Sequence, residues 1–94
     1  MGLQHTNIVD STAMRDGWAV LTIHHFDTWE PAEEKLQWLH KKFQHYLKHL
    51  QQPAWLNRFA DAPTRIELVG SEPATEDIAQ LCRILDIHLI TPEP

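Results

Sequence analysis

The chain has 94 residues and a mass of 11.0 kDa, which fits a single domain over residues 1–94 and leaves no room for a second. Its content of 43% hydrophobic and 22% charged residues excludes collagen-like, disordered and low-complexity chains. The net charge of −5 argues against a polyanionic partner such as nucleic acid. With no signal-peptide pattern and no apolar run near the roughly 20 residues that cross a bilayer, we expect a soluble, cytoplasmic protein without a membrane partner.

A β-hairpin is predicted at the start of the chain. Residues 6–14 indicate a first strand, because β-branched side chains recur at Thr6, Ile8, Val9 and Thr12. Asp16 and Gly17 then form the dipeptide typical of a two-residue type I′ turn. Residues 18–25 form the second strand, and their nearly continuous apolar character favours an interior position in the sheet.

A long amphipathic helix follows. Two starting points are open: Asp27 caps the helix with Glu30 reaching back, or Pro31 occupies the first helical position. In either case Trp29 is expected to pack under the first turn and to be buried. The helix ends before Pro53, and Leu47 widens its apolar stripe. The stripe consists of Leu36, Leu39, Phe43, Tyr46 and Leu50.

The second half of the chain predicts a short helical turn within residues 53–64, a strand at 65–70, a helix and a last strand at 87–91. The short turn is indicated by Trp55, Leu56 and Phe59. Thr75 caps the helix and Asp86 turns the chain after it. The apolar stripe of this helix is Ile78, Leu81, Cys82 and Leu85.

The resulting order ββαβαβ predicts an α+β fold, a two-layer sandwich. Two strand–helix–strand units imply parallel pairing and right-handed crossovers, so both helices should cover one face of a four-stranded mixed sheet. We expect the strand order 1-2-3-4, with the first strand antiparallel to the second.

Residues 35–59 contain five cations and no acid, which leaves two interpretations open. Clustered lysines and arginines are typical of an anion or nucleic-acid surface. Cations near a helix C-terminus and acids near its N-terminus also complement the helix dipole. We favour the second interpretation and predict no nucleic-acid partner. The cations are Lys35, Lys41, Lys42, Lys48 and Arg58.

Three stretches resemble a family of small bacterial proteins, domain of unknown function 6572. They are VLTI at 20–23, FDTWE at 26–30 and LQWLHKKFQHYL at 36–47. The chain departs from the family pattern by placing Thr28 between Asp27 and Trp29, and by His24 where an acidic or small polar residue is common. The matching positions are mostly core and cap residues. The resemblance therefore implies the fold and brings no catalytic residues.

Histidine is the one enriched reactive residue type, with seven copies. His45 and His49 have a spacing that can bind a transition metal, but no third ligand or general base accompanies them. His24 or His25, at the end of a strand, could act as a base, yet no serine or cysteine nucleophile is placed for it. Cys82 is expected to be a buried, inert thiol. We therefore predict no catalytic residue, no cofactor and no metal ligand.

Alternation along the strands defines two faces of the predicted sheet. The helix-covered face should hold Leu21, Ile23, Ile66, Leu68, Ile87 and Leu89. The opposite face, called the open face below, should hold Trp18, Val20, Thr22, His24, Arg65, Glu67, Val69, His88 and Ile90. The predicted partner-binding residues on it are Trp18, Val20, Thr22, His24, Arg65, Glu67 and His88. Tryptophan and arginine are frequent interface hot spots.

The leading hypothesis is a non-catalytic bacterial interaction protein of the adaptor or immunity-protein type. Its open face would bind a protein partner or a second copy of the chain. Three alternatives remain: a metal-binding protein that uses His24, His88 and a nearby acid, a small enzyme with His24 or His25 as base, and an open face that is merely solvated or is covered by the N-terminal arm and residues 53–64.

Overall fold

Four strands form one mixed sheet in the order β1-β2-β3-β4. The computed structural model describes residues 3–59 and 61–90. Its strands are β1 (Ser11–Arg15), β2 (Trp18–His25), β3 (Thr64–Gly70) and β4 (His88–Ile90). Its helices are α1 (Ala32–Leu50), α2 (Pro53–Phe59) and α3 (Glu76–Leu85).

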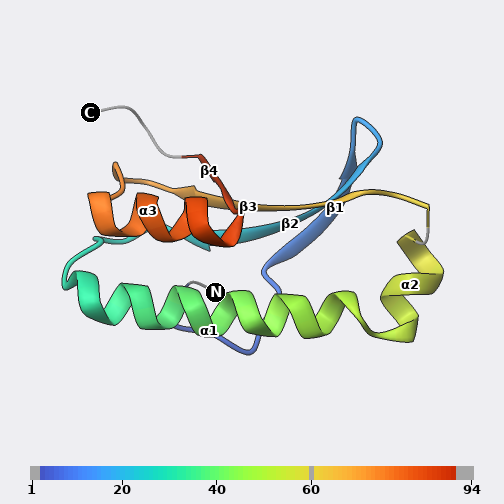
Figure 1. Cartoon of the computed structure of the whole chain (residues 1–94), viewed down its shortest axis with the longest axis horizontal. Coiled ribbons are helices and arrows are strands. Elements are labelled where there is room, and N and C mark those ends of the chain that lie inside the picture. The colour runs from blue at the N-terminus through green and yellow to red at the C-terminus, as the bar shows by residue number, and fades with distance from the viewer. Residues whose placement is uncertain (1–2, 60, 91–94) are drawn as a thin grey trace.

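The strand pairing confirms the predicted topology. β1 and β2 are antiparallel, whereas β2–β3 and β3–β4 are parallel. Figure 1 shows α1 and α3 on one side of the sheet, with α2 at the end of α1. The α+β two-layer class is therefore confirmed, and α2 is the short helix expected within residues 53–64. No helix in the described ranges has the length and apolar character needed to cross a membrane.

The β1–β2 hairpin has the predicted turn. Asp16 and Gly17 both have positive φ angles, 52° and 83°, and Arg15 pairs directly with Trp18. These angles match a type I′ turn, whose twist suits the flanking strands. The local dipeptide therefore sets the register that decides which β1 and β2 side chains share a face.

Replacing Gly17 with alanine is expected to lower the free energy of unfolding by about 1 kcal/mol, because a Cβ is strained at positive φ. Nothing lies within 4 Å of the position of that Cβ, so the cost comes from the backbone alone. Asp16→Asn is the matched control, since asparagine suits the same turn. Urea denaturation of the two variants checks this. Equal stability of Gly17→Ala and wild type would contradict the turn assignment.

The first strand begins later than predicted. β1 starts at Ser11, not at Thr6, so the expectation of a strand over residues 6–14 is wrong for its first five positions. Leu3 is instead part of the hydrophobic core, and the Asp10 carboxylate accepts a hydrogen bond from the backbone N–H of His24 at 2.9 Å. Leu3 anchors the segment before β1 in the core, and the Asp10 side chain bonds it to β2. The segment is therefore held in place without pairing as a strand.

Neither predicted start of the long helix is right. Pro31 is the residue before the first helical turn, with extended backbone angles, and no side chain caps α1. The Asp27 carboxylate accepts from the N–H of its neighbour Thr28 instead. A short local hydrogen bond of this kind competes with helix capping. The acidic residues Glu33 and Glu34 in the first turn and the basic residues Lys48 and His49 in the last turn follow the predicted dipole pattern.

The buried stripe of α1 is displaced from the predicted one. Its buried residues are Lys35, Leu39, Lys42 and Tyr46, so the prediction is right for Leu39 and Tyr46 and misses the two lysines. Leu36, Phe43 and Leu50 are only partly buried and pack against the edge of the core. Two of the five cations predicted as exposed helix charges, Lys35 and Lys42, therefore point inward.

The C-terminal half agrees with its sequence pattern. The Thr75 hydroxyl accepts from the N–H of Ile78, and Asp86 ends α3 in the left-handed region at φ 59°. The last strand is shorter than predicted, His88–Ile90, with Ile87 in the connection and Thr91 outside the described residues. These caps hold α3 against α1 and β4.

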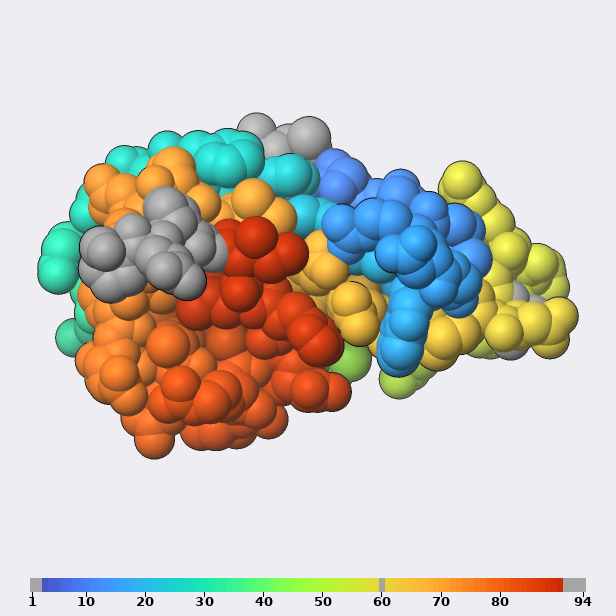
Figure 2. Space-filling view, turned by 90° about the horizontal axis from the view of Figure 1, so that it is seen from above, coloured from blue at the N-terminus to red at the C-terminus, as the bar shows by residue number. Residues whose placement is uncertain are grey.

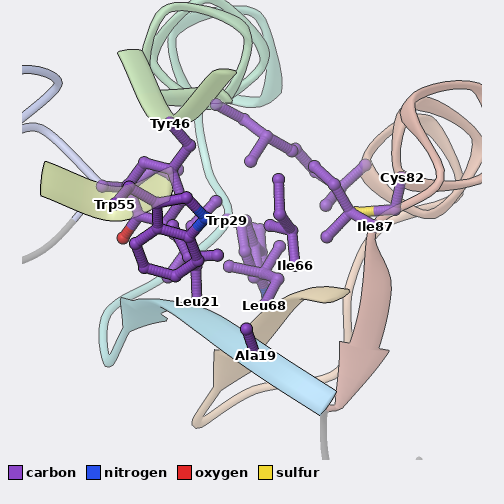
Figure 3. Packing of buried hydrophobic residues seen from close by; sticks show 13 residues of the cluster. Ala19, Leu21, Trp29, Tyr46, Trp55, Ile66, Leu68, Cys82 and Ile87 are labelled. Atoms are coloured by element: carbon purple, nitrogen blue, oxygen red, sulfur yellow. The ribbon is translucent and has the colours of Figure 1, made fainter. Parts of the chain in front are cut away.

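The core lies between the sheet and the helices, as Figure 3 shows for Leu21, Ile66 and Leu68 of the strands opposite Tyr46 of α1 and Cys82 of α3. The predicted helix-facing residues Leu21, Ile23, Ile66, Leu68 and Ile87 are all buried. Leu89 is half-buried. The two faces of the sheet are thus assigned as the alternation predicts.

Candidate interaction surface

The open face lies on the side of the sheet away from α1. Figure 2 views the molecule from that side, where α1 is almost entirely hidden beneath the strands. The strand register assigns each predicted partner-binding residue to this face, together with Ser11, Ala13 and Arg15 of β1. Alternation therefore places the predicted residues correctly, and their burial and contacts decide what they can bind.

Trp18 and Arg65 form a stacked pair at the hairpin end of the open face. The Arg65 guanidinium carbon lies 4.7 Å from the centre of the Trp18 ring. Trp18 retains 36% of its exposure and the Arg65 side chain 33%, so both reach solvent. A cation over an aromatic face is held by the ring quadrupole. The pair is thus a partly rigid, solvent-facing platform.

Glu67 lies between two arginines. Its carboxylate forms an ion pair with Arg15 from β1, and its second oxygen lies 3.9 Å from Nη1 of Arg65. The Glu67 side chain keeps only 7% of its exposure. The hydrogen bond and the charge of Glu67 raise the pKa of the Arg15 guanidinium, whose side chain is about half exposed. This ion network ties the edge strand β1 to β3 across β2.

Val20 is buried, which corrects its prediction as a partner-binding residue. Only 3% of it is exposed, although it belongs to the open face. Arg15 lies opposite Trp18, and Glu67 lies opposite Thr22, so the link from Arg15 to Glu67 passes over the position between them, which is Val20. Long side chains on the same face therefore cover it. Val20 therefore packs beneath these side chains and exposes almost no surface that a partner could contact.

The other end of the open face is more apolar. Ile90 and Phe26 are exposed, and Phe26 is in ring contact with His24 at 5.4 Å. Nε2 of His24 lies 3.4 Å from the Ser11 hydroxyl, whereas its buried Nδ1 has no partner in the described part of the chain. Exposed apolar and polar groups thus alternate over this end, as they do over many contact surfaces.

A buried polar cluster joins the N-terminal segment, β2 and α1. Nζ of Lys42 lies 2.7 Å from the Asp10 carboxylate, and both side chains are completely buried. Lys42 also donates to the carbonyl of His5 at 3.0 Å. The Tyr46 hydroxyl donates to the carbonyl of Thr22 and accepts from the N–H of Asp10. Sequence reasoning missed this cluster, because its members are far apart in the chain.

This cluster is a structural tie, since no solvent reaches its charges. Burial raises the pKa of Tyr46 well above its ordinary value, so the hydroxyl stays protonated and can keep donating to Thr22. The Asp10 carboxylate accepts from the N–H of His24 and from Nζ of Lys42, and such partners are what a buried carboxylate requires. The arrangement fixes the strand β2, on which the centre of the open face lies.

The histidine alternatives find little support in the geometry. Nε2 of His25 donates to the Thr28 carbonyl at 2.8 Å, and its buried ring packs against Trp29. His49 contacts Trp55 edge-on. Within residues 3–59 and 61–90, no three His, Cys, Asp or Glu side chains are grouped closely enough to hold a metal ion.

Cys82 is a buried free thiol, and burial raises its pKa to about 11. It is therefore protonated at neutral pH, which makes it a poor nucleophile. The expectation of an inert core cysteine agrees with this environment.

Comparison with known proteins finds no matching family model, no matching curated protein and no matching solved structure. What the chain does must therefore be argued from its own surface.

Proposed function

We propose that this protein is a non-catalytic interaction module that binds a protein partner through the open face of its sheet. One observation carries the proposal: the stacked pair of Trp18 and Arg65 stands exposed on a face that α1 and α3 leave uncovered. Both residue types dominate the binding energy of protein interfaces. Thr22, His24 and His88 continue the same face along the strands away from the pair, and the buried Val20 and Glu67 lie between them and the pair.

The sheet gives this surface the rigidity that an interface needs. A face built on strands keeps its side chains in fixed positions, so less conformational entropy is lost on binding. The ion network of Arg15, Glu67 and Arg65 adds crosslinks between strands. An adaptor or immunity-protein role suits such a surface. The cytoplasmic location, the bacterial source and the resemblance to domain of unknown function 6572 stay predictions.

The proposal is tested by Trp18→Glu, which removes the ring and places an acid beside Arg65. We expect association to be lost while the fold stays intact, because Trp18 is only partly buried. Light scattering on wild type and variant, alone and with the product of the neighbouring gene, measures association, and circular dichroism measures folding. Val20→Lys is unsuitable, since Val20 is 3% exposed and a lysine there would disturb the fold.

Ile84→Glu is the matched control, because Ile84 is the same kind of exposed apolar residue, 71% accessible, on α3. It should leave association unchanged. The proposal fails if wild type stays monomeric at high concentration and Trp18→Glu binds every partner that wild type binds. It also fails if both variants weaken binding equally.

A further inference from the structure

We propose that the open face recognises a carboxylate, which an acidic segment of the partner protein presents to Arg65 and Arg15. This inference rests on the proposed function and names the chemistry of its partner. It follows from the hydrogen bonds that the Arg65 side chain does not make, from the way Trp18 holds Arg65, and from the balance of charge on the face.

Arg65 has unused hydrogen-bonding capacity. A guanidinium carries five N–H donors. In the described residues, Arg65 makes no hydrogen bond to protein: its one carboxylate neighbour, Glu67, is 3.9 Å away, and its buried Nε has no partner. The buried Nε is out of a partner's reach, but the side chain is 33% exposed, and a carboxylate is the acceptor that suits the N–H groups at its exposed end. Within the described residues, the Arg65 guanidinium therefore has no hydrogen-bond acceptor, which a partner's carboxylate would supply.

Trp18 holds the Arg65 guanidinium before any ligand arrives. The guanidinium carbon lies over the Trp18 ring at 4.7 Å from its centre, so a cation–π contact already holds the group in place. A group that is already positioned loses less side-chain freedom when it binds. The stack would also place the indole beside the incoming carboxylate, where it can pack against the aliphatic stem of an aspartate or glutamate. One platform therefore offers both charge and apolar contact.

The charges on the face favour a single carboxylate. Two arginines, Arg15 and Arg65, share the one carboxylate of Glu67, which leaves an excess of one positive charge. Asp16 in the adjacent turn also acts on Arg15, but more weakly than Glu67 does. One added carboxylate balances the pair of arginines. A polyphosphate chain would instead bring several negative charges to a group of side chains with an excess of one positive charge.

The same charges argue against a symmetric pair of this chain. In a twofold dimer the same patch meets itself, so the arginines of both copies, Arg15 and Arg65 twice over, would lie in one interface. Like charges brought together in an interface cost binding energy. The occupant we propose is therefore a different protein with an acidic segment.

Selection of random peptides displayed on phage tests the inference, with immobilised wild-type protein as the target. We expect the enriched peptides to share an aspartate or glutamate. The best of them, made synthetically, should bind Arg65→Gln about ten- to a hundredfold more weakly than wild type, the effect of losing a charge-assisted hydrogen-bonded pair. Exchanging its acid for the amide should weaken binding to wild type by a similar factor.

Two further variants keep the result interpretable if Arg65→Gln folds poorly. Arg15→Gln changes a side chain that is 54% exposed and should also weaken binding. Arg83→Gln is the matched control, because Arg83 lies on α3 and pairs with Glu76 at 3.5 Å, off the open face. It should bind the peptide as wild type does. Circular dichroism confirms that each variant is folded.

The other outcomes overturn the inference in distinguishable ways. Enriched peptides that lack an acid but lose binding in Trp18→Glu would refute carboxylate recognition and leave the proposed function standing. Peptides that bind every open-face variant equally would refute both. Self-association of wild type that Arg65→Gln abolishes would show that the occupant is a second copy of the chain, in a head-to-tail contact.

Discussion

Replacing Lys42 with methionine is expected to lower the free energy of unfolding by about 3–5 kcal/mol, because Asp10 then stays buried without its cation. A domain of this size has a total stability of roughly 5–14 kcal/mol, so the loss is a large share of it. The carbonyl of His5 also loses one donor and keeps the backbone N–H of Ile8, at 3.3 Å. Urea denaturation followed by circular dichroism measures the effect.

Lys41→Met is the matched control, since Lys41 is the next residue on α1 and its side chain is exposed. It should change stability by no more than about 0.5 kcal/mol. The double variant Asp10→Asn/Lys42→Met removes both charges and should be more stable than Lys42→Met alone. If the two lysine variants had equal stability, the Asp10–Lys42 pair would not form in solution.

Trp29→Ala is expected to cost on the order of 3 kcal/mol, the usual range for truncating a buried aromatic residue. Trp29 is 2% exposed, packs against His25 with ring centres 4.3 Å apart, and donates from Nε1 to the carbonyl of Glu72 at 3.0 Å. Denaturant melting measures the change. A cost below about 1 kcal/mol is incompatible with this buried position.

Two variants separate the contributions at Trp29. Trp29→Phe keeps a ring and loses the hydrogen bond to Glu72, so its cost should lie between those of wild type and Trp29→Ala. Phe26→Ala, at a nearby residue that is 64% exposed, should have little effect on stability. Burial of Trp29 was predicted from its place at the start of the helix, and the structure confirms it.

Local patterns predicted much of this fold. The Asp16–Gly17 turn has one favoured geometry, and the apolar alternation of Leu21 and Ile23 leaves one choice of inner face. The parallel pairing of β2 with β3 follows from the crossover between them. In these places the controlling interactions lie within a few residues in sequence, or follow from chain connectivity.

Long-range polar contacts were beyond the sequence pattern. Lys35, Leu39, Lys42 and Tyr46 have the spacing of a helix face, and the predicted stripe contains Leu39 and Tyr46. Because lysine is rarely buried, the predicted stripe has Leu36 and Phe43 in place of Lys35 and Lys42. Lys42 is buried because Asp10, from a distant part of the chain, neutralises it. Nothing in the residues around Lys42 indicates that partner.

The sequence predicts which residues belong to the open face but not how deeply each of them is buried. The alternation of side chains along β2 places Val20 on this face correctly. It does not indicate whether long neighbouring side chains cover Val20. Arg15 was not among the predicted site residues, yet its link to Glu67 covers Val20 and completes the arginine pair. The sequence does contain a signal for Arg15: the hairpin turn fixes a register in which Arg15 lies opposite Trp18.

The crossover between β2 and β3 also governs the order in which the molecule assembles. The β1–β2 hairpin is joined by two residues and can form in about 1–10 μs, whereas β3 must wait until α1 and α2 have been brought round. Nonlocal pairing of this kind slows folding. Arg15 and Trp18 therefore meet early, within one hairpin, but the arginine pair exists only after β3 has added Arg65 and Glu67. The binding surface is then a late product of folding, and a partially folded chain that contains the finished hairpin still lacks it.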